Sequence, residues 1–192
     1  MRYHAAVNEQ TRFARASHAV PITADDFLRM LELGAFEDMR AELVRGEIEK
    51  MMPAEWTHGE LNARIIALLF PLAKAIGAKV GTDVVIRIDD LTVRAFDVVV
   101  VRPEASPHKA LRGEEVLFAV EIAETTHKRD LGEKRDEYGA AGIPAYWVID
   151  SVKNHTHCFR LDDSGTAYGP AEIVPFGKPM EIPGLPGTVT ID

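Results

Sequence analysis

The stretch Phe96-Asp-Val-Val-Val-Val101 is strand-length, β-branched and almost continuously apolar, and Leu117-Phe-Ala-Val-Glu-Ile-Ala123 has the same character. Runs of this kind predict strands that are covered on both faces of a sheet. Val80 to Ile88 and Tyr146-Trp-Val-Ile149 predict two further strands. The segment from His155 to Leu161 is expected to pair with the last of these through a turn at residues 151–154.

Two segments have helical periodicity, one before these strands in the sequence and one between two of them. Apolar residues recur at helical spacing from Thr57 to about Ile76, and Thr57 with Glu60 has the pattern of a capping box. Thr126 to Ala141 predicts another helix, which Gly142 ends.

Shorter elements precede the long helix. Thr23 is expected to cap a helix that ends at Gly34, and residues 41–49 predict two short strands around a turn at Arg45-Gly46. The order of helix, strands, helix and strands predicts an α/β fold, with a mixed central sheet flanked by helices.

The composition restricts the class of protein. The chain has 192 residues, of which 46% are hydrophobic and 27% are charged, as is typical of one soluble globular domain. We expect residues 1–20 to form a flexible N-terminal arm and residues 21–192 to form this domain. No apolar run reaches the ~18 residues of a membrane helix, and the N-terminus lacks the apolar core of a secretory signal. Because Cys158 is the only cysteine, no internal disulfide is expected, and a cytoplasmic location without membrane contact is predicted.

Two acidic residues interrupt the apolar strands, and they carry the chemical hypothesis. Asp97 and Glu121 each lie in a strand where an unpaired carboxylate is costly to bury. Neighbouring strands are ~4.8 Å apart, so two such side chains could chelate one hard cation, for which Mg²⁺ is the natural choice and Mn²⁺ a possible substitute. The alternative is that each acid ends its strand or pairs with a basic residue.

Lys134 is the third candidate. It shares a helix face with Leu131, Tyr138 and Ala141, which are expected to contact the sheet, so Lys134 interrupts a buried stripe. A lysine there could direct its ammonium at the strand acids and stabilise negative charge on a phosphate or position the attacking water. The alternative is a snorkelling lysine, or one paired with Asp130 a turn earlier.

These residues resemble a known pattern. Phe96-Asp97, Glu121-Ile-Ala and the run from Asp130-Leu-Gly-Glu-Lys134 through Tyr146-Trp-Val-Ile-Asp150 are similar to the PD-(D/E)XK nuclease superfamily. More specifically, they resemble its large bacterial branch of restriction-endonuclease-like proteins, long catalogued as a domain of unknown function. The resemblance also includes Glu42-Leu-Val-Arg-Gly-Glu-Ile48 and Thr57-His-Gly59, and it spans roughly residues 22–190.

The resemblance implies a restriction-endonuclease-like core that cleaves DNA with Mg²⁺. It implies that Asp97, Glu121 and the main-chain carbonyl of Ile122 bind the metal and that Glu42 is a further acid of the site. The chain departs from the pattern at two positions. Phe96 replaces the usual proline, and Ala123 occupies the usual lysine position, so the lysine is expected to have moved to Lys134.

The leading hypothesis is therefore a Mg²⁺-dependent endodeoxyribonuclease that acts as a homodimer. The formal net charge of -8 argues against avid non-specific binding of nucleic acid. Two alternatives remain open at this point. One is a nucleic-acid-binding or regulatory protein of the same fold with weak or no catalysis, and the other is a metal-dependent hydrolase of a different phosphoester.

Other polar residues have simpler interpretations. His155 and His157 share one strand face next to Cys158, but zinc sites usually need a second spaced pair of ligands, so no zinc site is predicted. His58 follows a helix cap and could approach the phosphate groove, but it is interpreted as a solvated residue at a helix start. Lys128, Arg129 and Arg135 form either a rim that contacts phosphates or an ordinary solvated helix face.

Overall fold

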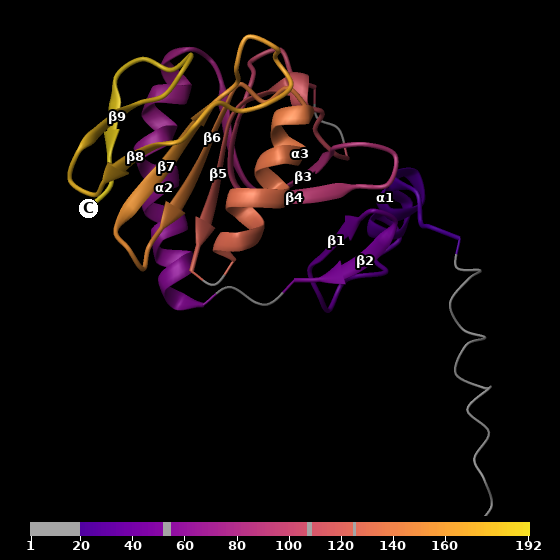
Figure 1. The fold of residues 1–192 in the computed structure, drawn as a ribbon. Helices are drawn as coiled ribbons and strands as arrows, with labels where there is room; N and C mark the ends of the chain where they lie inside the picture. The colour runs from indigo at the N-terminus through magenta and orange to yellow at the C-terminus, as the bar shows by residue number, and fades with distance from the viewer. Residues whose placement is uncertain (1–19, 52–54, 107–108, 125) are drawn as a thin grey trace, which may run out of the picture.

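The structure is a computed structural model that describes residues 20–51, 55–106, 109–124 and 126–192 (Figure 1). The predicted N-terminal arm, residues 1–20, lies outside the described residues except for its last residue. The helical elements are α1 (Ala24–Glu32), α2 (Trp56–Ala75), the 3-10 turn η2 (Gly113–Glu115), the π-helical turn η3 (Arg129–Lys134) and α3 (Arg135–Ala140). The strands are β1 (Ala41–Val44), β2 (Glu47–Lys50), β3 (Lys79–Arg87), β4 (Val93–Val101), β5 (Val116–Ala123), β6 (Ala145–Asp150), β7 (His155–Arg160), β8 (Glu172–Pro175), β9 (Pro179–Glu181) and β10 (Thr188–Thr190).

An eight-stranded sheet forms the centre of the molecule. Its order is β2-β1-β4-β5-β6-β7-β8, with β3 paired to β4, while β9 and β10 form a separate two-stranded sheet. Only β5 and β6 are parallel among the pairs of described strands. A parallel pair needs a crossover connection, and η3 with α3 supplies it. The predicted mixed sheet is therefore confirmed.

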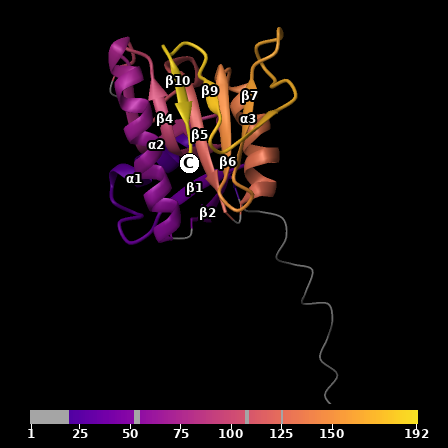
Figure 2. The same ribbon diagram turned by 90° about the vertical axis from the view of Figure 1, so that its left-hand side faces the viewer.

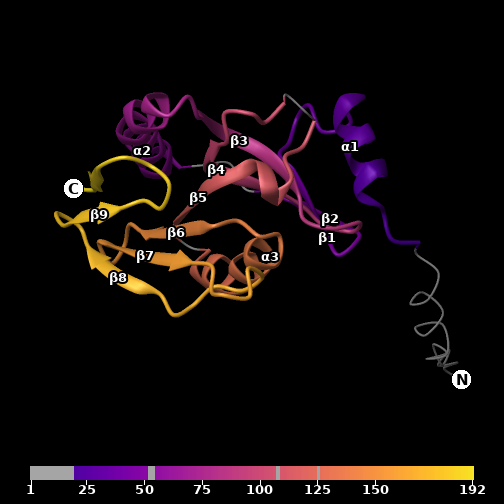
Figure 3. The same ribbon diagram turned by 90° about the horizontal axis from the view of Figure 1, so that it is seen from above.

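Helices cover both faces of the sheet. Figure 2 shows α2 on one side and α3 on the other, with β4, β5 and β6 between them. Seen from above, α1 lies with β1 and β2 at one end of the molecule, and β8 and β9 lie at the other end (Figure 3). Among the described residues, no helix combines the length and the apolarity that a membrane crossing requires.

The core is divided by the sheet into two main parts. On one face, Ile65 of α2 belongs to a buried cluster with Val120 and Trp147 of the sheet and with residues of the β9–β10 hairpin. On the other face, Tyr138 of α3 packs against strand residues that include Phe96 and Tyr146. All nine residues of β4 are buried, as its apolar sequence predicted.

The short N-terminal elements form as predicted. Thr23 and Asp26 make a capping box at the start of α1. Arg45 and Gly46 have φ values of 52° and 83°, which is the conformation of a tight hairpin turn, and they join β1 to β2.

The start of α2 differs from the prediction. The helix begins at Trp56, and Glu55 precedes it without a side-chain cap, so the predicted capping box of Thr57 and Glu60 is wrong. The Thr57 hydroxyl instead donates to Glu124 Oε1 at 2.8 Å. This hydrogen bond ties the first turn of α2 to the residue that follows β5.

The helix predicted over Thr126 to Ala141 is α-helical only in part. Residues Arg129–Lys134 form a π-helical turn, and α3 follows directly. Apolar periodicity indicated a helix here but could not show that one turn is wider. π-Helical turns are rare and occur frequently at functional sites, and this one buries both Asp130 and Lys134.

Candidate active site

Glu121 lies in the middle of β5 and is 3% exposed. Its neighbours at alternate positions, Ala119 and Ala123, pack in the cluster that contains Tyr138 of α3, so this face of β5 points to α3. The Tyr138 hydroxyl donates to Glu121 Oε1 at 2.7 Å, and Lys134 Nζ lies 2.9 Å from Oε2. Both oxygens of Glu121 are thus held by residues from the crossover helix.

Asp97 lies on the adjacent strand β4 and is 9% exposed. Val98 pairs with Val120 in the antiparallel ladder, which brings Asp97 level with the Glu121 region of β5. The main-chain N–H of Ile122 donates to Asp97 Oδ2 at 2.8 Å, and His58 Nε2 lies 3.2 Å from Oδ1. The two acids predicted as metal ligands therefore lie side by side.

Lys134 lies among these acids, with only 1% of its surface exposed. Its ammonium is 2.9 Å from Glu121 Oε2 and 3.5 Å from Glu42 Oε1. The snorkelling alternative is wrong, because the charged end points into the protein and not to solvent. The structure thus brings Lys134 to the strand acids, as was predicted from its position within the apolar stripe of its helix.

Glu42 joins the group from β1, and it is as buried as Lys134. The main-chain N–H of Ala95 donates to Glu42 Oε1 at 3.0 Å, and Arg94 Nη1 donates to Oε2 at 3.2 Å. Arg94 is fully buried and also makes a bidentate pair with Glu137 at 2.7 and 2.9 Å. The sequence reasoning did not single out Arg94, although an arginine inside a buried apolar strand signals such a pair.

Asp130 was considered only as a surface partner for Lys134, but it is 1% exposed. Its Oδ2 accepts a hydrogen bond from the Thr126 hydroxyl, and its Oδ1 has no hydrogen-bond partner among the described residues. A buried carboxylate oxygen without a donor is costly. Burial raises the pKa of Asp130 and the charge of Lys134 opposes this effect, so Asp130 lies near this cluster. Its position four residues before Lys134 was the available signal.

His58 was interpreted as solvated, and this interpretation is wrong. Its side chain is mostly buried and lies against Asp97. Burial alone would lower the pKa of His58, but the stronger hydrogen bond to Asp97 raises it. The histidine is placed there by the first turn of α2, which the sequence could not position relative to β4.

The acids divide into two groups, one with lowered pKa values and one with raised pKa values. Burial opposes ionisation of Asp97, but His58 and the Ile122 amide outweigh it and lower the pKa of Asp97. Burial likewise opposes ionisation of Glu42, but Lys134, the Ala95 amide and Arg94 lower its pKa.

In the second group, burial outweighs the effect of the neighbouring positive charge on the pKa. Burial raises the pKa of Glu121 well above its usual range, although Lys134 opposes the change. Burial also raises the pKa of Asp130 against the opposing effect of Lys134. For Lys134 itself, burial would favour the neutral form, but the surrounding carboxylates raise its pKa and keep the ammonium charged.

The donor set fits a hard divalent cation. The carboxylates of Asp97, Glu121, Glu42 and Asp130 all act on the charge of Lys134, although among the described residues no three of them have oxygens gathered closely enough to form a ready metal site. The buried cations among the described residues are Lys134 and Arg94. Asp130 Oδ1 has no hydrogen-bond partner among the described residues, so its lone pairs are free for a cation. Carboxylate oxygens that accept one hydrogen bond retain lone pairs for a metal such as Mg²⁺.

Comparisons with known proteins bear on the family and the fold of the chain. The family model described as "Uma2: Putative restriction endonuclease" matches residues 24–192. Among solved structures, the chain is similar to "a putative nuclease belonging to DUF820" from Anabaena variabilis ATCC 29413, with 16% sequence identity and a TM-score of 0.68. The alignment covers 85% of this chain and 90% of that chain, and at this identity it concerns the fold alone. No curated protein matches the chain. The resemblance and the fold class that were predicted from the sequence are confirmed.

Proposed function

The chain belongs to the Uma2 family, and on that premise we propose that it is a Mg²⁺-dependent endonuclease that hydrolyses phosphodiester bonds in DNA. The observation that carries the proposal is the buried contact of Lys134 with Glu121, beside Asp97 on the adjacent strand. This arrangement combines metal-ligating acids with a fixed positive charge. Both are required when a phosphodiester is attacked by water, because negative charge accumulates on the phosphate.

Asp97, Glu121 and the main-chain carbonyl of Ile122 would hold Mg²⁺, or Mn²⁺ in its place. When bound, the metal lowers the pKa of a water molecule and offsets the charge of the phosphate. Ile122 is suited to this role because its N–H is fixed by Asp97 Oδ2 at 2.8 Å, which also fixes the peptide next to Glu121. The metal ligands would thus be supported by two adjacent strands.

Lys134 would orient the attacking water and stabilise the negative charge of the reacting phosphate. The carboxylates around it keep its ammonium charged, so it acts as a fixed cation and not as a general base at neutral pH. Glu42 would also hold the ammonium, which lies 3.5 Å from its Oε1, and Arg94 in turn holds Glu42. We therefore assign Glu42 to the site as a residue that positions Lys134.

DNA would approach from the side of Asp97 and His58, which are the members of the cluster with the most exposed side chains. Trp56, at the start of α2 close to His58 in sequence, is 86% exposed and could contact the DNA there. Lys128 is exposed at the start of the crossover helix. A homodimer would place two such sites on one duplex. Light scattering of the purified protein measures its oligomeric state directly.

Cleavage of supercoiled plasmid tests the proposal. The protein, first stripped of metal with EDTA, should nick or linearise the plasmid when Mg²⁺ or Mn²⁺ is added and leave 5′-phosphate ends. Asp97→Ala and Glu121→Ala should each lower the rate by at least about 1,000-fold while the fold is retained, since each removes a metal ligand. Asp163→Ala removes an exposed acid outside the cluster and should leave the rate unchanged.

Two results would contradict the proposal. If cleavage persists in both Asp97→Ala and Glu121→Ala, the activity comes from another site or a contaminant. If the native protein binds Mg²⁺ but cleaves neither double-stranded nor single-stranded DNA, the function is that of a catalytically inactive binding protein or of a hydrolase acting on another phosphoester.

A further inference from the structure

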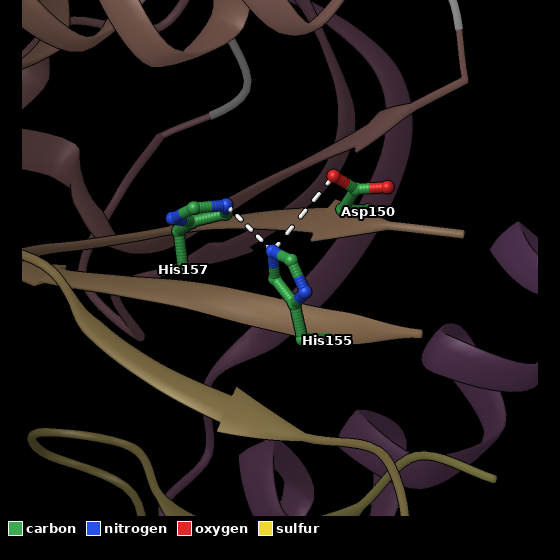
Figure 4. Close-up of side chains that lie close together, drawn as sticks. All are labelled: Asp150, His155 and His157. Carbon is green, nitrogen blue, oxygen red and sulfur yellow. Dashed lines mark hydrogen bonds and ion pairs between the residues drawn. The ribbon is translucent and has the colours of Figure 1, made fainter. Parts of the chain in front are cut away.

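A second group of potential metal ligands lies where β6 turns into β7 (Figure 4). Asp150 is the last residue of β6, His155 is the first residue of β7, and the two are partners in the antiparallel ladder. His157 is two residues further along β7, so it lies on the same face as His155. Three residues with ligand atoms therefore converge at this end of the hairpin.

The distances are close to those that a metal ion requires. His155 Nε2 lies 2.9 Å from His157 Nε2 and 3.8 Å from Asp150 Oδ2, and all three ligand atoms lie within 4.8 Å of one another. In a tetrahedral site with metal–ligand bonds of ~2.0–2.1 Å, ligand atoms are ~3.3–3.4 Å apart. Side-chain rotations alone could bring the three atoms to that spacing.

The carboxylate of Asp150 is fully buried and directs one oxygen to the histidines. Its Oδ1 accepts a hydrogen bond from the main-chain N–H of Lys153 at 2.8 Å and lies 2.9 Å from His127 Nε2. Its Oδ2 accepts no hydrogen bond of good geometry from the described residues, and it faces His155 Nε2 and the Lys153 ammonium, which is 3.2 Å away. One oxygen is thus fixed by the protein and the other is available to a cation.

The protonation states also suit a metal site. Burial opposes ionisation of Asp150, but His127 and Lys153 outweigh it and lower its pKa to about 2. Burial and the neighbouring His155 lower the pKa of His157.

We propose that Asp150, His155 and His157 form a binding site for a divalent transition-metal ion of the zinc class. Two imidazoles and one carboxylate are ligands that Zn²⁺ accepts, and a hard ion such as Mg²⁺ prefers oxygen ligands only. Three protein ligands leave a fourth position open for water or an anion. The sequence analysis predicted no zinc site because it found no second spaced pair of ligands, whereas here the third ligand, Asp150, comes from the neighbouring strand.

This site is distinct from the acid cluster. Glu121 pairs with Val148, and Asp150 is two residues further along the adjacent strand β6. Strand geometry therefore separates the Cα atoms of Glu121 and Asp150 by about 8 Å. The histidine site takes its ligands from β6 and β7, whereas Asp97 and Glu121 lie on β4 and β5, so the two groups share no ligand.

Cys158 does not belong to this site. It alternates to the opposite side of β7, where its Sγ lies 3.7 Å from Met180 Sδ in the core next to α2. Lys153, by contrast, is a competitor for the ion, because its ammonium sits beside Asp150 Oδ2 and its side chain is largely exposed. His127 lies behind the carboxylate and would act as a positioning residue.

Calorimetric titration of the EDTA-stripped full chain with ZnCl₂ at pH 7.5 tests the proposal. The titrations use an Asp97→Asn/Glu121→Gln background, which removes the acid cluster as a competing site. One zinc ion should bind per chain. His155→Ala and His157→Ala should each weaken binding by at least about 100-fold, and His127→Ala by about tenfold. His58→Ala is the matched histidine control and should leave the affinity unchanged.

Lys153→Ala provides a test that does not depend on losing a ligand. Removal of the competing ammonium should tighten zinc binding several-fold, whereas a merely structural role of the histidines predicts no change. Circular dichroism of each variant establishes that the fold is retained. The proposal is overturned if the background protein shows no saturable zinc binding, or if His155→Ala and His157→Ala in folded form bind zinc as tightly as the background does.

Discussion

Lys134 is a buried cation whose removal leaves Glu121 without a cationic partner among the described residues, while Glu42 keeps Arg94. Its ammonium contacts Glu121 and Glu42. Removing one partner of a buried ion pair typically costs about 3–5 kcal/mol, because the remaining charge is left unpaired. We therefore expect Lys134→Met to lower the free energy of unfolding by about 3 kcal/mol at pH 8.

The loss in Lys134→Met should shrink as the pH falls from 8 to 5. Burial raises the pKa of Glu121, and without Lys134 this pKa rises further, so the carboxyl takes up a proton on acidification and its unpaired charge disappears. In the native protein the raised pKa of Lys134 gives a contribution that is fully present throughout this range and is lost only at more alkaline pH. Urea unfolding at the two pH values measures the difference.

Two variants control this experiment. Lys178→Met removes an exposed lysine and should leave stability unchanged at both pH values. Glu121→Gln/Lys134→Met removes both members of the pair and should be more stable than Lys134→Met at pH 8. An equal loss at pH 8 and pH 5 for Lys134→Met would show that packing, and not charge, explains the effect.

Residue chemistry alone identified part of the site. Asp97 and Glu121 could be identified from the sequence because a carboxylate inside an apolar strand has few inexpensive explanations. Lys134 could be identified because it interrupts an apolar stripe, while Glu42 came from the family resemblance. His58 and Arg94 were not identified, since their contacts with Asp97 and Glu137 join residues 39 and 43 positions apart. Such contacts depend on how elements pack, which residue types do not reveal.

At the level of elements, the π-helical turn η3 determines how the crossover helix faces the sheet. A π-helical turn contains one residue more than an α-helical turn would. Within η3, Asp130 and Lys134 are both buried, while Gly132 lies between them and has no atom within 4 Å of where a Cβ would be. At Gly132, a deletion changes the length of the turn, whereas a substitution changes the side chain and keeps that length.

Deletion of Gly132 should convert this turn to α-helix and rotate Asp130 relative to Lys134 by about one residue, or roughly 100°. We expect plasmid cleavage to fall by at least about 100-fold, since misplacement of catalytic groups by about 1 Å already has such an effect. Gly132→Ala keeps the length and should retain cleavage, with stability equal to or slightly above that of the native chain. Retention of full activity after the deletion would show that the π-helical turn is not needed for the site.

Most elements were predictable, and those that were not share a physical reason. The strands β4, β5 and β6 follow from their apolar sequences, and the β1–β2 turn follows from Arg45-Gly46. The helix cap at Thr57 was mispredicted because its hydroxyl bonds to Glu124, a residue of another element. The π-helical turn was missed because apolar spacing constrains which face is buried but not the width of a turn.

At the level of the whole molecule, the net charge of -8 opposes DNA binding, so any affinity must come from a local basic surface. Lys128, Arg129 and Arg135 near the acid cluster are the candidates for that surface. Arg129 and Arg135 lie within 4.0 Å of Glu49 and Asp136, which reduces their net effect. We expect weak binding with a shallow dependence on salt.

Three phosphate contacts predict a slope of about -3 when the logarithm of the DNA association constant is plotted against the logarithm of salt concentration. Lys128→Ala should reduce the size of this slope by about 1 and weaken binding equally for all DNA sequences. Fluorescence anisotropy with the Asp97→Ala variant measures binding without cleavage, and Lys178→Ala serves as the exposed-lysine control. An unchanged slope for Lys128→Ala would exclude this helix as the phosphate contact.

The arrangement of the whole chain agrees with the sequence interpretation. The family match over residues 24–192 and the fold shared with the Anabaena variabilis protein support one restriction-endonuclease-like domain, which we propose to comprise residues 21–192. The mixed sheet follows from one parallel pair, β5 and β6, joined by the helix that carries Lys134. The same crossover that defines the fold thus carries the lysine to the acids of β4 and β5.

The most direct test of the central claim is the position of a bound metal ion. Crystals grown with Mn²⁺ and measured near the manganese absorption edge should give an anomalous peak between the carboxylates of Asp97 and Glu121, within about 2.0–2.3 Å of an oxygen of each. The peak should be lost in Asp97→Ala crystals grown under the same conditions. A fully occupied manganese site elsewhere in the chain, with no peak between Asp97 and Glu121, would contradict the account.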